Sequence, residues 1–331
     1  SFLMFVLTVV MLSSIYLAWS AERGFGEVIV ERRSVRTSDG GGNAYTLMRT
    51  RSAENIGQLA VVLLIPAIGS TGEDLLLLGM ELARRNFTVV VVDLSNFTTD
   101  VATDSSSITR VAGVCTDLLS SVSGKDAPYP DRWGVVAYGT GARVADALAE
   151  DGVVPSATVI LGPLTDTGLA GPRSILGNTL IVGATTSGPT ADSYLQLLRR
   201  VTGNESAQPW VTYGNLTLGT AYRLQLSVVP QYGVAEGIIP VHVIVDWMIR
   251  GVQGEDQLEH TLHPGRLVLG AAVIARWTGT LGLLGSAFCL IMIVSKTLSD
   301  SPHSTDSAVS YTHLRAHETR HDLVCRLLLE K

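Results

Sequence analysis

Lysine and cysteine are scarce in this sequence, and their scarcity argues against several functional classes. Only three of the 24 basic residues are lysines, and the formal net charge is −6. A chain with this balance offers no basic patch for nucleic acid, so no nucleic-acid partner is expected. The cysteines are too widely and irregularly spaced for a disulfide framework or a cysteine metal site; they are Cys115, Cys289 and Cys325. No metal is therefore expected.

Long apolar stretches are present near both ends. Residues 1–21 carry no charge and are long enough to span a bilayer, so we predict a membrane anchor, with a cleaved signal peptide as the alternative. A second membrane region is predicted over 265–296, where Trp277 to Ser295 is uncharged. Arg276 within it is costly at mid-bilayer and predicts an interface or a bundle-facing position. Residues 297–308 are predicted to form a polar loop.

The segment 309–331 resembles the translation of a sequencing adapter, and we expect it to be an artefact that does not pack against the rest of the chain. It also suggests a metal site. Histidines and a cysteine repeat every four residues and would line one face of a helix as zinc ligands; they are His313, His317, His321 and Cys325. The adapter resemblance covers the whole segment, so the zinc site is disfavoured.

Between the apolar stretches, residues 25–252 alternate short β-branched runs with amphipathic stretches. Leu59 to Ile65 is a continuous apolar strand, Asp74 to Arg85 is a helix with leucines on one face, and Thr88 to Asp93 is again a strand. Such alternation predicts βαβ units and a mostly parallel sheet. Continuous apolar strands also predict helices on both faces of that sheet.

A glycine-bracketed turn within 132–150 lies between a predicted strand and a predicted helix. This is the layout of a nucleophile elbow, G-x-S-x-G, but Gly139 stands where the serine would be. With the stretches 81–93 and 130–136, this turn resembles the α/β-hydrolase family over about Gly26 to Arg250. The membrane-anchored members common in archaea are the most similar. The resemblance implies an α/β-hydrolase fold flanked by transmembrane helices.

The resemblance also implies positions for the rest of a catalytic triad. The acid position falls on Thr186 and the base position near Gly233, so neither has the expected side chain. The loop after the first parallel strand departs as well, with Pro66-Ala67 in place of His-Gly. We therefore expect a non-catalytic module that binds a protein partner or a small ligand. Candidate ligand-binding residues are Tyr138, Ser70, Glu236 and His242.

Two alternative interpretations use other residues. A serine hydrolase with a relocated site would pair Ser70 or Ser95 with His242, the one histidine of this domain. A dinucleotide site at the elbow is disfavoured because Val144 stands at the third glycine position of that motif. No cofactor is expected.

Four of the seven asparagines begin an N-x-S/T sequence, the acceptor of N-glycosylation; they are Asn86, Asn96, Asn204 and Asn215. Chance predicts about one, because serine and threonine make up about one residue in six. This excess favours an extracytoplasmic domain. The positive-inside rule does not help, because the loop between the apolar stretches is far longer than the roughly 60 residues over which that rule applies.

Overall fold

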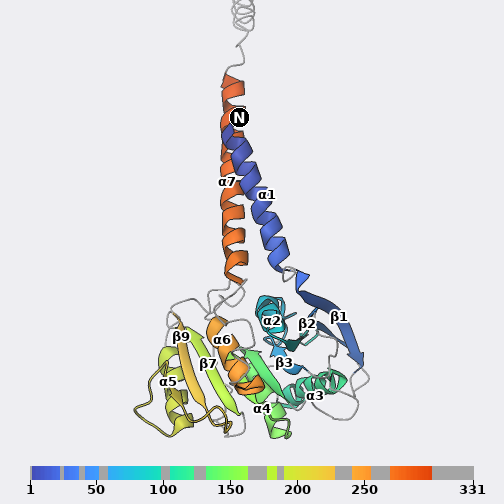
Figure 1. Cartoon of the computed structure of the whole chain (residues 1–331), viewed down its shortest axis with the longest axis vertical. Helices are drawn as coiled ribbons and strands as arrows, with labels where there is room; N and C mark the ends of the chain where they lie inside the picture. Colours follow the sequence, from blue (N-terminus) through green and yellow to red (C-terminus); the bar gives the residue numbers. More distant parts are fainter. Residues whose placement is uncertain are drawn as a thin grey trace, which may run out of the picture. The chain divides into compact units, whose positions relative to one another are not determined.

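A computed structural model describes residues 2–22, 26–36, 42–51, 59–97, 105–122, 132–162, 177–184, 190–227, 241–254 and 269–299 (Figure 1). Within these residues, nine strands form one mixed sheet in the order β1-β2-β4-β3-β5-β6-β7-β9-β8. The strands are β1 (Val28–Arg36), β2 (Gly42–Thr50), β3 (Ala60–Ile65), β4 (Phe87–Val92), β5 (Trp133–Tyr138), β6 (Ala157–Leu161), β7 (Asn178–Ala184), β8 (Thr212–Tyr213) and β9 (Tyr222–Ser227). The six strands from β4 to β9 in that order are parallel, and β1, β2 and β8 pair antiparallel.

Helices cover both faces of the sheet. They are α2 (Leu76–Ala83), preceded by the 3-10 turn η3 (Glu73–Leu75), α3 (Ser105–Val122), α4 (Gly141–Glu150), α5 (Thr190–Thr202) and α6 (Val241–Met248), which continues into the π-helix η5 (Ile249–Gln253). The packing on both faces of strand β3 explains why its sequence is continuously apolar. Val62 and Leu64 pack with α2 and α6, whereas Val61 and Leu63 pack with α3 and α4 on the opposite face. The predicted α/β fold with a mostly parallel, doubly covered sheet is confirmed.

The edge of the sheet beyond β9 is closed by a short segment. Strand β8 pairs with the start of β9, and Trp210 just before β8 continues that pairing. Its backbone N–H donates to Leu224 O at 2.7 Å and its indole N–H donates to Leu226 O at 3.2 Å. Trp210 adopts a positive φ of 65°, which is rare for a bulky residue. The unpaired groups of an edge strand are thereby satisfied, which limits pairing with other chains.

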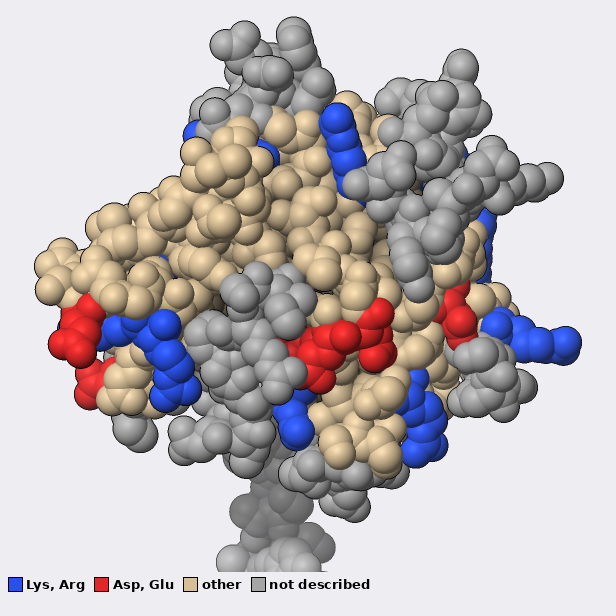
Figure 2. Space-filling view, turned by 90° about the horizontal axis from the view of Figure 1, so that it is seen from below, with Lys and Arg blue, Asp and Glu red and all other residues tan. Residues whose placement is uncertain are grey.

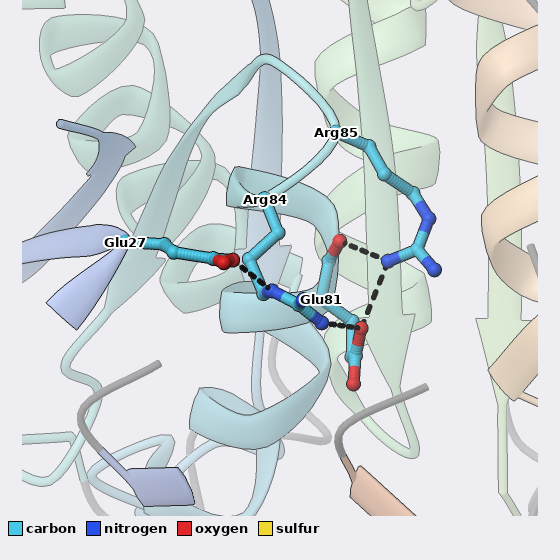
Figure 3. A network of polar contacts seen from close by, with 4 residues as sticks. All are labelled: Glu27, Glu81, Arg84 and Arg85. Atoms are coloured by element: carbon cyan, nitrogen blue, oxygen red, sulfur yellow. Dashed lines mark hydrogen bonds and ion pairs between the residues drawn. The ribbon is translucent and has the colours of Figure 1, made fainter. Parts of the chain in front are cut away.

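A polar network joins the two ends of this domain (Figure 3). Arg84 Nε donates to Glu27 Oε2 at 2.8 Å, and Arg85 Nη1 donates to Glu81 Oε2 at 2.8 Å. Gln253 Nε2 donates to the backbone oxygen of Arg85 at 3.0 Å. The side chains of Arg85 and Glu81 are only 0% and 2% exposed, so this is a buried ion pair. The start of β1 and the end of η5 are thus both bound to the turn between α2 and β4.

Two helices contain the apolar stretches, α1 (Phe2–Glu22) and α7 (Leu269–Ser299). Within the described residues, Trp277–Ser295 of α7 is long and apolar enough to cross a membrane, whereas the apolar stretch Phe5–Leu17 of α1 is shorter than a span. The membrane prediction is therefore supported only weakly, by the second helix.

The chain divides into two compact units, Ser1–Leu12 with Thr278–Lys331, and Ser13–Trp277. Inside the first unit, α1 and α7 approach closely at two glycines. A Cβ on Gly282 would lie 3.4 Å from Met11 Cβ, and one on Gly285 would lie 3.4 Å from the side chain of Leu7. Glycines at such contacts are a common means of packing helices in membranes.

Candidate functional site at the strand–helix elbow

The turn between β5 and α4 has the geometry of an elbow. Tyr138 ends the strand, Gly139 follows with a φ of +55°, and α4 begins at Gly141. The N–H of Gly139 donates to Leu161 O at 2.8 Å, and its carbonyl accepts from Ala142 N at 3.1 Å. The chain thus reverses from strand to helix over a single residue in the left-handed region, as an elbow requires.

The two glycines of the elbow have different reasons for being small. A Cβ on Gly141 would lie 2.6 Å from Pro66 O and 2.8 Å from Ile65 O, so any side chain there collides with the end of β3. A Cβ on Gly139 would lie 3.8 Å from Ala67 Cβ, which is an ordinary van der Waals distance. Packing therefore requires glycine at 141 but leaves space for a side chain at 139, where only the positive φ opposes one.

The loop after β3 lies against the elbow and is bound to it. The N–H of Ile68 donates to Thr140 Oγ1 at 2.9 Å. In hydrolases that use an elbow, an amide of this loop and the amide following the nucleophile bind the oxyanion. Thr140 follows Gly139, and its hydroxyl occupies one amide of that loop. While this hydrogen bond holds, the Ile68 amide is not available to a ligand oxygen.

Tyr138 lies partly in the core on the face of the sheet that α2 and α6 cover. Its ring packs on Gly162, where a Cβ would lie 2.8 Å from Tyr138 Cε2. A second tyrosine, Tyr194 of α5, donates a short hydrogen bond from its hydroxyl to Gly162 O. Two tyrosines therefore fix the end of β6 beside the elbow. Sequence reasoning missed Tyr194, because nothing in α5 distinguishes it from an ordinary core residue.

The two serines of the relocated-site alternative form hydrogen bonds with other residues. Ser70 Oγ accepts from Gly72 N at 3.3 Å in the turn before η3, and Ser95 Oγ donates to Asp93 Oδ1 at 2.6 Å. His242 is exposed at the start of α6. Across the described segments, neither serine hydroxyl forms a hydrogen bond with His242. The described geometry therefore gives no support to a Ser–His pair.

Cys115 is not a substitute nucleophile. It is fully buried in α3, and this burial raises the pKa of the thiol to about 12. A thiol with that pKa is protonated at neutral pH and unreactive. Among the described residues, no group of three or more His, Cys, Asp or Glu side chains is placed to hold a metal ion.

Several predicted positions lie outside the described residues. These are the acid position Thr186, the base position near Gly233, the candidate ligand residue Glu236, and the tail residues His313, His317, His321 and Cys325.

Charge on the surface is mixed where it can be seen. On the face in Figure 2, basic and acidic side chains are interspersed among uncharged residues. Among the described residues, an ion pair joins Arg250 Nε of η5 to Asp246 Oδ1 of α6 at 3.0 Å. On this face, interspersed charges of both signs do not form a single basic surface of the kind that attracts a polyanion.

No family model and no curated protein matches this chain. Solved structures do match at low identity. One is an enzyme assigned as a dienelactone hydrolase from Klebsiella pneumoniae subsp. pneumoniae, at 12% identity over 67% of this chain and 99% of that one, with a TM-score of 0.48. A thermostable esterase from Pseudomonas putida matches at 11% identity over 75% and 89%, with a TM-score of 0.46. The isopeptidase AtxE2 matches at 14% over 75% and 44%, with a TM-score of 0.48. No activity is carried over from these proteins.

Proposed function

We propose that this protein is a membrane-anchored, hydrolase-like α/β domain without catalytic activity, which binds a protein partner or a small ligand. The observation that carries the proposal is Gly139. The elbow has the conformation that presents a nucleophile, yet its central residue has no side chain. We further propose that the domain lies outside the cytoplasm and that α7 anchors it, with α1 as a second anchor.

Loss of the nucleophile removes most of the rate enhancement that this type of site produces. Without a triad, oxyanion stabilisation and binding alone leave roughly 10³–10⁴ over the reaction in water. Here one amide of the loop that supplies an oxyanion donor is bound by Thr140 Oγ1 at 2.9 Å. We therefore expect even this residual enhancement to be reduced.

The test is an activity measurement on the full chain in detergent or nanodiscs. Short-chain aryl esters and a fluorophosphonate probe are offered to the wild type and to Ser70→Ala, Ser95→Ala and His242→Ala. We expect no labelling in any of the four, and ester hydrolysis by the wild type that is no faster than by the three variants. Labelling that disappears in one of the serine variants and in His242→Ala would refute the proposal and establish the relocated-site hydrolase instead.

Gly139→Ser is the companion variant. It returns a hydroxyl to the elbow at a position with space for a Cβ. Because the resemblance puts the acid position on Thr186 and the base position near Gly233, we expect the new serine to lack an activating base. We expect this variant to remain unlabelled. Rapid labelling of Gly139→Ser would place a working base beside the elbow and contradict the proposed loss of the triad.

A further inference from the structure

The segment between α5 and β9 contains two complete N-x-S/T sequences on the surface. Asn204 and Ser206 are both exposed, as are Asn215 and Thr217. Asn204 Oδ1 accepts from Ser206 N at 2.9 Å. Asn215 Oδ1 accepts from Thr217 N at 2.8 Å and also from the Thr217 hydroxyl. In both cases the acceptor amide and the third residue of the sequence face each other in an exposed turn.

The site at Asn86 has a different setting. Asn86 is itself exposed, but its third residue, Thr88, is 0% exposed inside strand β4, beside Val61 of β3. An enzyme cannot reach the Thr88 hydroxyl without opening the sheet. The site at Asn96 is exposed at its asparagine and continues beyond the described residues. The folded domain therefore presents Asn204 and Asn215 most completely.

We propose that Asn204 and Asn215 are N-glycosylated. In this reaction the side-chain amide nitrogen of each asparagine bonds to the anomeric carbon of an oligosaccharide carried on a lipid phosphate. The bond from that carbon to the phosphate oxygen breaks, the amide nitrogen loses one proton, and the lipid phosphate leaves. The proposal rests on the extracytoplasmic placement proposed above, because the sugar donor is used on that side of the membrane.

Apolar side chains beside these sites give the sugars a physical role. Leu218 is 75% exposed and Trp210 is 54% exposed, both in the same segment as the two asparagines. The backbone N–H of Leu218 lies 3.4 Å from Asn215 Oδ1, so a glycan on Asn215 begins beside this leucine. A hydrated oligosaccharide there shields the exposed Leu218 side chain from water.

The experiment is translation of the full chain with membrane vesicles that carry the glycosylation machinery. We expect Asn204→Gln and Asn215→Gln each to lose one glycan step in gel mobility, and the double variant to lose two. Thr217→Ser keeps the acceptor sequence and should keep the step, whereas Thr217→Val has nearly the same shape and should lose it. Enzymatic removal of N-glycans should bring all variants to one mobility.

Protease added outside the vesicles distinguishes a failure of the glycosylation proposal from a failure of the proposed extracytoplasmic placement. A domain that is protected but unmodified at both asparagines overturns the glycosylation proposal and leaves the extracytoplasmic placement intact. A domain that is digested refutes the placement and, with it, the glycosylation. Retention of the glycan step in Thr217→Val would also overturn the assignment to Asn215.

Discussion

Replacing Glu81 with leucine is expected to destabilise the domain by about 3 kcal/mol. Removing one partner of a buried ion pair costs about 3–5 kcal/mol because the other charge is left uncompensated. Arg85 is fully buried, and its Nη1 lies 2.8 Å from the Glu81 carboxylate. The lower end of that range applies because Arg85 Nη1 keeps its 2.7 Å hydrogen bond to the backbone oxygen of Glu81, which survives the substitution.

Glu27→Leu is the matched control. Glu27 pairs with Arg84 at 2.8 Å, but its side chain is 56% exposed. Exposed pairs contribute about 0–1 kcal/mol, and Arg84 also keeps its contact with Glu81 at 3.5 Å. Both variants replace a glutamate with a leucine. The difference of about 2 kcal/mol or more between their losses of stability therefore measures the effect of burying the ion pair.

Urea unfolding provides the assay, because urea is uncharged and leaves ion pairs unscreened. The buried Trp133 and Trp247 should report the transition through their fluorescence. With a slope of about 3 kcal/mol/M, a loss of about 3 kcal/mol lowers the midpoint by about 1 M. Adding Arg85→Met to Glu81→Leu should recover most of the loss, since apolar replacement of a buried pair is often neutral. Equal midpoints for Glu81→Leu and Glu27→Leu, or no recovery in the double variant, would refute the reasoning.

Three further predictions concern the elbow and the core. Gly139→Ala should cost about 1–2 kcal/mol of stability, from its positive φ alone. Gly141→Ala should cost clearly more, because its Cβ would lie 2.6 Å from Pro66 O. The same urea assay compares the two variants, and equal losses of stability would contradict the packing argument. Thr140→Val should cost about 1–2 kcal/mol of stability by leaving the Ile68 amide without its acceptor. Amide hydrogen exchange at Ile68 should become faster. Unchanged exchange there would contradict the proposal that Thr140 occupies this amide. Cys115 should resist maleimide until the domain unfolds. The pKa of its thiol is raised from 9.0 to about 12, so the folded state holds the proton more tightly than the unfolded state. The contribution of this thiol to stability should therefore fall as pH rises from about 9 toward 12. Rapid maleimide labelling of the folded domain would contradict the burial of this thiol.

The sheet could be predicted from sequence because the sequence of a single strand is enough to identify it as buried on both faces. In β3, alternate residues enter two different cores, so a strand such as 60–65 has no polar position and its continuous apolar run is diagnostic. The elbow could be predicted for a similar reason, since glycines at 139 and 141 between a strand and a helix leave few other conformations. Both signals are local.

The contacts that connect the elbow and other loops to distant parts of the chain are not local, and the sequence contains no sign of them. Thr140 and Ile68 are 72 residues apart, and Gln253 and Arg85 are 168 apart. Trp210 has a positive φ, a backbone conformation that is unfavourable for a bulky residue. Hydrogen bonds from its backbone and indole N–H groups to β9 compensate for this conformation. Such pairings depend on where the sheet brings distant loops, so they could not be found before the fold was known.

The conformation of the elbow can be explained by the packing around it. Gly141 is required by the 2.6 Å approach of Pro66 O, and the Gly139 N–H is required by Leu161 O of the neighbouring strand. Thr140 binds the loop after β3 through its side chain. Each of these contacts stabilises the junction of β3, β5 and β6 and none involves a nucleophile. The turn is therefore accounted for by packing alone, and its presence is not evidence that the protein catalyses a reaction.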